Sequence, residues 1–132
     1  MNESMQLVLI YSGFQLLIGL VLAINAVKLR FKTQILLGDD GNTEMLKAMR
    51  SHGNWSEYSP AYIISLLLIS LVQGPLWLIH TIGIMSFIGR ASHAYGLNQE
   101  QDPNLFRQAG FILSVFTMLI CVIALIYLGY TL

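Results

Sequence analysis

The sequence predicts an all-helical membrane protein, a bundle of four transmembrane helices. Its 132 residues are 55% hydrophobic and only 11% charged, whereas about a quarter of the residues in a soluble domain carry a charge. Four apolar segments, separated by short polar stretches, follow one another along the chain. The bilayer is therefore the expected solvent, and residues 1–132 form one predicted domain.

The first apolar segment, residues 5–27, contains no charged residue. As a helix rising about 1.5 Å per residue, it is long enough to cross a hydrocarbon core of roughly 30 Å. It lacks the basic start and the small-residue cleavage site of a signal peptide, so we expect it to remain in the mature protein. Residues 28–40 mix basic side chains with glycine and aspartate, which predicts a surface loop.

The second predicted helix, residues 43–72, has two halves of different character. Asn42 or Thr43 can cap its N-terminus, and residues 44–57 are amphipathic. Residues 58–72 are apolar but only about 22 Å long as a helix, which is too short to span the bilayer. The polar half must therefore supply part of the span.

Two further helices complete the predicted bundle. Gln73, Gly74 and Pro75 predict a tight turn, and the third helix follows at residues 76–96. The polar residues 98–104 form the next loop, and the fourth helix occupies residues 105–130. His80 has apolar neighbours in the third helix, so we expect it to be buried and hydrogen-bonded rather than to bind a ligand.

Basic residues gather at one end of this predicted bundle. All seven lie near the loop between the first two helices or near the loop between the last two: Lys28, Arg30, Lys32, Lys47, Arg50, Arg90 and Arg107. The opposite end has the two termini and an uncharged turn. Because basic residues favour the cytoplasmic side of a membrane, both termini are predicted to face away from the cytoplasm.

Composition and spacing argue against several classes of function. The formal net charge is zero and no basic stripe is interleaved with aromatic residues, which argues against a nucleic-acid partner. Cys121 is the only cysteine, so neither an internal disulfide nor a cysteine-based zinc cluster can form. The three histidines have no paired spacing, and no metal site is predicted.

The polar half of the second helix concentrates its charges on one face. On a helix that advances about 100° per residue, Arg50, Asn54 and Glu57 project at roughly 0°, 40° and −20°. Lys47 and Tyr58 border this stripe. On the third helix, Arg90 and His93 lie within about 60° of each other at the same predicted depth. Two polar faces are therefore expected to meet near one membrane boundary.

This polar face has two interpretations. Arg50 and Glu57 could be an interfacial ion pair that reaches toward water, with Asn54 joining two helices by a hydrogen bond. Alternatively, the face could bind a small zwitterion. Arginine can clamp a carboxylate with two hydrogen bonds, asparagine can match a peptide group, and glutamate can accept from an ammonium. Ionisable residues within a membrane span favour the functional interpretation.

The residues of this face resemble the signature of the MAPEG family, the membrane-associated proteins of eicosanoid and glutathione metabolism. The stretch "RSHGNWSEYSP" at residues 50–60 carries the arginine, asparagine, glutamate and proline spacing. The resemblance extends to "AVKLRFK" at residues 26–32 and to "GRASHAYG" at residues 89–96. It covers nearly the whole chain and is strongest for the small bacterial inner-membrane branch.

The resemblance implies a homotrimer that holds glutathione between neighbouring protomers near the cytoplasmic face. It also implies which positions contact glutathione and which one lies near the sulfur. The implied glutathione-binding residues are Arg30, Arg50, His52, Asn54, Glu57, Tyr58, Arg90 and His93, with Arg30 reaching in from a neighbour. Arg107, at the start of the fourth helix, is the candidate for the arginine that stabilises the thiolate.

This chain also departs from the family pattern on the third helix. Where members that form eicosanoids have tyrosines, it has His93 and Leu97, so no aromatic hydroxyl is expected at those positions. The implied chemistry is attack by a glutathione thiolate on a lipophilic electrophile from the bilayer, or reduction of a lipid hydroperoxide. A guanidinium beside the sulfur would favour the thiolate over the thiol, whose reference pKa is about 8.5.

Three functions are therefore compatible with these residues. The first is a glutathione-dependent membrane transferase or peroxidase with a role in detoxification. The second is a non-catalytic membrane protein that binds glutathione or a lipid. The third is a small multidrug transporter, which needs a membrane-embedded acidic residue, and Glu57 is the deepest carboxylate on the chain.

Overall fold

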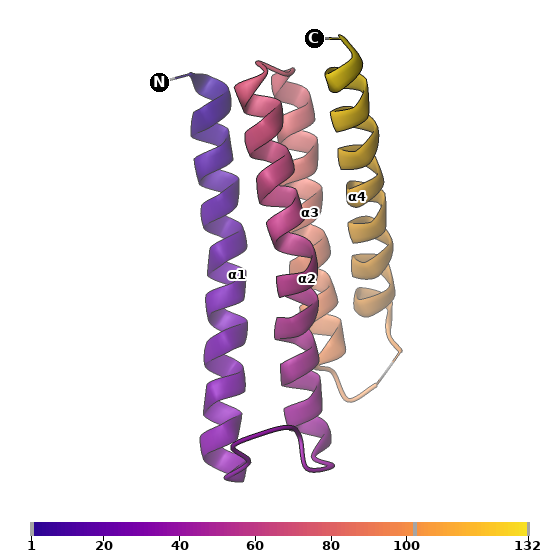
Figure 1. Ribbon diagram of the computed structural model, residues 1–132. Helices are drawn as coiled ribbons and strands as arrows, with labels where there is room; N and C mark the ends of the chain where they lie inside the picture. Colours follow the sequence, from indigo (N-terminus) through magenta and orange to yellow (C-terminus); the bar gives the residue numbers. More distant parts are fainter. Residues whose placement is uncertain (1, 102, 132) are drawn as a thin grey trace.

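The protein is a single bundle of four long helices. The computed structural model describes residues 2–101 and 103–131, and its helices are α1 (Glu3–Thr33), α2 (Thr43–Leu71), α3 (Leu76–Leu97) and α4 (Leu105–Thr131). Both ends of the chain and the α2–α3 turn lie at one end of the bundle (Figure 1). The α1–α2 and α3–α4 connections lie at the other end. The four predicted helices are confirmed.

The predicted boundary of the first helix is wrong by six residues. Residues 28–33 continue α1 instead of starting the loop, because they include no proline or glycine that would end a helix. Arg30 and Lys32 also lie in the last turn, where cations stabilise the negative end of the helix dipole. The helix ends at Thr33, and its C-cap Gln34 has a left-handed backbone with φ 58°.

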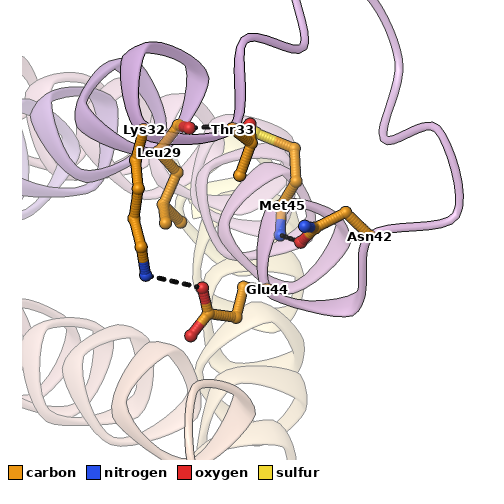
Figure 2. Close-up of polar contacts among 6 residues, drawn as sticks. All are labelled: Leu29, Lys32, Thr33, Asn42, Glu44 and Met45. Carbon is orange, nitrogen blue, oxygen red and sulfur yellow. Dashed lines mark hydrogen bonds and ion pairs between the residues drawn. The ribbon is translucent and has the colours of Figure 1, made fainter.

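The corner between α1 and α2 is closed by side chains from both helices (Figure 2). The Asn42 side chain accepts from the backbone N–H of Met45 at 2.9 Å, so Asn42 is the N-cap of α2. The Lys32 ammonium lies 3.2 Å from the Glu44 carboxylate, an exposed ion pair that adds little stability by itself. Arg30 donates to the carbonyls of Ile35 and Gly38 and so holds the connecting loop.

The helices differ in how much apolar surface they leave uncovered. Within the part of the chain that the structure describes, α1 and α4 are the two helices long and apolar enough to cross a membrane. They do not contact each other, whereas α2 and α3 contact each other and both outer helices. Large apolar side chains project outward from α1 and α4, including Leu16, Leu20, Phe116 and Leu119. Such continuous apolar faces suit contact with lipid.

An apolar core fills the half of the bundle nearest the termini. Tyr62, Leu66 and Ile69 of α2 are fully buried there against Ile79 and Ile82 of α3. The Tyr62 hydroxyl donates to the Ser114 carbonyl at 2.8 Å, so even this aromatic residue has its polar atom satisfied. The core therefore fixes how α2, α3 and α4 are rotated relative to one another.

A buried polar network joins the first three helices near the middle of the bundle. Gln15 of α1 is fully buried, and its side chain accepts from the Ser59 hydroxyl at 2.9 Å and donates to the Ser86 hydroxyl at 3.0 Å. The Trp55 indole donates to the Gln15 carbonyl at 2.9 Å. Trp55 also lies directly on Gly19, where a larger residue would collide with the ring. Hydrogen bonds of this kind hold helices together where water is excluded.

His80 does not occupy the buried position expected for it. Its side chain is exposed in the protomer, so the predicted burial is wrong, although the expected hydrogen bond is present. The Tyr11 hydroxyl lies 2.7 Å from His80 Nδ1. The apolar neighbours of His80 in the sequence are distributed around a membrane helix, so they did not indicate which way the side chain points.

Glycines allow α3 and α4 to approach each other closely. A Cβ added at Gly110 would overlap the backbone nitrogen of His93 and lie 2.8 Å from the Gly89 carbonyl. Both obstacles are backbone atoms, which cannot turn aside as a side chain can. Small residues at such contacts are typical of helix pairs in membranes.

We expect Gly110→Ala to destabilise the folded protein by about 1–3 kcal/mol, because the helices must separate to admit the methyl group. Thermal unfolding in detergent, followed by circular dichroism, measures the effect. Gly129→Ala is the matched control on the same helix, since a Cβ there meets no atom within 4 Å. Equal unfolding temperatures for the two variants would contradict the close contact.

Candidate functional site

The predicted polar stripe on α2 is present. Arg50 Nη2 donates to Asn54 Oδ1 at 3.3 Å, and Arg50 Nη1 lies 3.9 Å from Glu57 Oε1. The Arg50 and Glu57 side chains are 55% and 56% exposed, so the face is open in the protomer. Glu57 is at the midpoint of α2. An open pair of charges so far along a helix of a membrane bundle has hydrogen-bonding capacity left for a polar partner.

Arg90 lies behind this stripe and is turned inward. It is only 3% exposed, and its Nε donates to Ser114 Oγ at 3.0 Å while Nη2 bonds the same oxygen. Its Nη1 donates to the Asn54 carbonyl at 3.3 Å. The guanidinium carbon is 4.4 Å from the centre of the Tyr58 ring, a cation–π contact. Arg90 therefore ties the backbone of the stripe to α3 and α4.

Ser114 is a residue of this cluster that the sequence did not indicate. It is fully buried on α4, and its hydroxyl donates to the Gly110 carbonyl at 2.7 Å while accepting from Arg90. A serine inside the apolar run of α4 was the available signal. Its partner is 24 residues away on another helix, so spacing along one helix could not reveal the pair.

The other predicted site residues lie in the half of the bundle that ends at the α1–α2 and α3–α4 loops. His52 is half-buried beside Trp55, with the two ring centres 5.6 Å apart. His93 is 8% exposed at the α3–α4 contact. Arg30 lies at the end of α1, where its guanidinium holds the connecting loop. The stripe, Arg90 and Tyr58 thus form one connected group, while Arg30 belongs to the corner between α1 and α2.

Arg107 lies in the first turn of α4. Its backbone N–H is capped by Asn104 Oδ1 at 3.1 Å, and Asn104 also donates to the Gly96 carbonyl at 2.7 Å. A Cβ at Gly96 would lie 2.7 Å from the Arg107 Cα. Gly96 thereby allows the start of α4 to rest on the end of α3, which fixes the half-buried Arg107 at this end of the bundle.

Among residues 2–101 and 103–131, no three histidine, cysteine, aspartate or glutamate side chains gather closely enough to hold a metal ion. Cys121 is buried in the apolar core, on the other half of the bundle. The polar face and the residues behind it present guanidinium, carboxylate, amide and aromatic groups.

These features together define a class of protein. The bundle has four helices, and two of them are apolar enough to cross a bilayer. It contains a polar cluster that the buried Arg90 fixes. This combination defines a helical membrane protein with a polar site. The chain belongs to the MAPEG family, whose family profile matches residues 8–127.

Curated relatives are found in bacteria. The chain is 29% identical over 115 residues to the "Inner membrane protein YecN" of Escherichia coli K12, covering 87% of this chain and 86% of the relative. The protein of the same name from Escherichia coli O6:H1 gives the same values. No solved structure matches the chain.

Proposed function

We propose that this protein is a glutathione-dependent membrane transferase or peroxidase that acts on lipophilic electrophiles. The observation that carries the proposal is the open face of Arg50, Asn54 and Glu57, fixed from behind by the buried Arg90. Membership of a family named for eicosanoid and glutathione metabolism supports the choice of ligand.

The charges of this face complement those of glutathione. Glutathione has two carboxylates, one ammonium and two peptide groups. Arg50 suits a carboxylate, Glu57 suits the ammonium and the Asn54 amide suits a peptide group. Because Arg90 bonds the Asn54 carbonyl, the backbone of this turn is held in place before the ligand arrives. Less ordering is then needed on binding.

We further propose that all four helices span a bacterial inner membrane and that three protomers assemble with glutathione between them. The long, roughly parallel arrangement of the helices supports the first point (Figure 1). The relatives are inner-membrane proteins by name. The open polar face supports the second point, since a neighbouring protomer that supplies Arg30 would close it. The basic end faces the cytoplasm in this arrangement.

The proposed reaction begins with the glutathione thiolate, stabilised by Arg107. In the transferase reaction, the sulfur attacks an electrophilic carbon, a C–S bond forms and the leaving group departs with its electron pair. The electrophile reaches the site from the bilayer along the apolar faces of α1 and α4. In the peroxidase reaction, the thiolate attacks the terminal oxygen of a lipid hydroperoxide, the O–O bond breaks and the lipid alcohol departs. A second glutathione then reduces the resulting sulfenic acid, which gives glutathione disulfide and water.

Isothermal titration of the purified protein with glutathione tests the binding site. We expect Arg50→Ala to weaken binding by about 10- to 100-fold, because hydrogen bonds to charged groups contribute about 1.5–3 kcal/mol each. Glu57→Gln should weaken it by a similar factor. The matched control is Lys32→Gln, which removes an exposed cation outside the polar face. Absence of saturable binding by the unmodified protein would refute the proposal.

A non-catalytic binding protein is the second candidate, and the buried His93 favours it. By its resemblance to the family, His93 stands where members that form eicosanoids have a tyrosine, so we expect the ligand to lack that hydroxyl contact here. Turnover of a general electrophile distinguishes the two functions: glutathione binding without conjugation or peroxide reduction would identify a binding protein.

A further inference from the structure

A groove lies between α1 and α3 on the loop half of the bundle. Its volume is about 720 Å³, within the range of about 300–1,000 Å³ that small-molecule sites occupy. Leu17 and Val21 of α1 form one wall, and Phe87 and Ala91 of α3 form the other. These residues lie within helices rather than loops, so the groove opens toward the hydrocarbon region and suits an acyl chain.

The groove has a polar end at the last turns of both helices. Asn25 and Lys28 of α1 meet Asn98 and Gln99 there, where α3 ends. Lys28 is exposed and Asn25 is half-buried, and neither side chain has a hydrogen bond or ion pair to any residue that the structure describes. One cation and one amide are therefore available at the mouth of an apolar groove.

Lys28 differs in this respect from the other two lysines. The Lys32 ammonium pairs with Glu44, and the Lys47 ammonium donates to the Gln99 carbonyl at 2.6 Å. Lys47 thereby fixes the backbone at the rim of the groove. Lys28 has no such internal partner among the described residues, so its charge is available to a ligand.

We propose that this groove binds one anionic phospholipid, with an acyl chain between α1 and α3 and its phosphate at Lys28 and Asn25. Basic pockets between membrane helices on the cytoplasmic side suit anionic head groups. Among the described residues that line the groove, Lys28 is the one charged side chain, so this lining favours an anionic over a zwitterionic head group. This site is separate from the α2 face assigned to glutathione, and the inference does not depend on that function.

Native mass spectrometry of the purified protein with dioleoylphosphatidylglycerol or dioleoylphosphatidylcholine tests the site. We expect tighter binding of phosphatidylglycerol. Lys28→Gln should weaken it about fivefold, the fold-change that corresponds to about 1 kcal/mol per lysine near an anionic lipid. Ala91→Phe, which fills the groove, should remove binding of both lipids at this site.

Lys32→Gln is the control, since it removes the same charge one turn further along α1. Circular dichroism and elution volume check that each variant folds. The site is refuted if Lys28→Gln and Lys32→Gln weaken phosphatidylglycerol binding equally, or if Ala91→Phe leaves lipid binding unchanged. A change in oligomeric mass for Ala91→Phe, with lipid binding retained, would mean that a second copy of the chain fills the groove, which also refutes the proposal.

Discussion

Arg90→Ala is expected to lower the free energy of unfolding by roughly 3 kcal/mol or more. The change removes the hydrogen bonds from the guanidinium to Ser114 and to the Asn54 carbonyl, and bonds from charged groups contribute about 1.5–3 kcal/mol each. It also removes the cation–π contact with Tyr58 and leaves a cavity beside that ring. Thermal unfolding in detergent should show an apparent Tm about 10 °C lower.

Two comparisons make this prediction specific. Arg90→Lys keeps the charge but cannot reach both acceptors in the planar arrangement of a guanidinium, so it should recover only part of the loss. Arg50→Ala removes an exposed arginine from the same cluster and should change the Tm little, since exposed ion pairs contribute about 0–1 kcal/mol. An Arg90→Ala protein as stable as the Arg50→Ala protein would show that the buried cluster does not hold the bundle together.

The polar face of α2 could be predicted because it depends on one helix. Arg50, Asn54 and Glu57 are four and three residues apart, and helical geometry alone places them together. The N-cap at Asn42 was predictable for the same reason, since capping is a local effect. The continuation of α1 to Thr33 was missed because basic residues in a polar stretch suggested a loop, although nothing there breaks a helix.

Features that depend on how helices are rotated against one another were not predictable. Arg90 was expected beside the stripe, but its inward orientation follows from the position of Ser114 on α4. Gln15 was not singled out as the centre of a network, because Ser59 and Ser86 come from two other helices. In a membrane protein, apolar side chains face both the lipid and the core, so hydrophobicity does not reveal which side of a helix is inside.

Arg107→Ala should leave glutathione binding mostly intact and remove the thiolate. If the guanidinium lowers the thiol pKa from about 8.5 to about 6.5, it supplies about 2.7 kcal/mol, and the thiolate fraction at pH 7 rises about 25-fold. The variant should lose that gain, so the ultraviolet absorbance of the thiolate would develop near pH 8.5 instead of pH 6.5. The conjugation rate at pH 7 should fall by a similar factor.

The matched control for this prediction is Gln108→Ala, which changes the exposed neighbour in the same turn of α4. Titration calorimetry with glutathione separates binding from ionisation, because a thiolate stabiliser need not hold the carboxylates or the ammonium. Unchanged thiolate absorbance in Arg107→Ala would discard Arg107 as the activator. The buried Arg90, whose nitrogens already donate to Ser114 and to the Asn54 carbonyl, could replace it only if those bonds broke when glutathione bound.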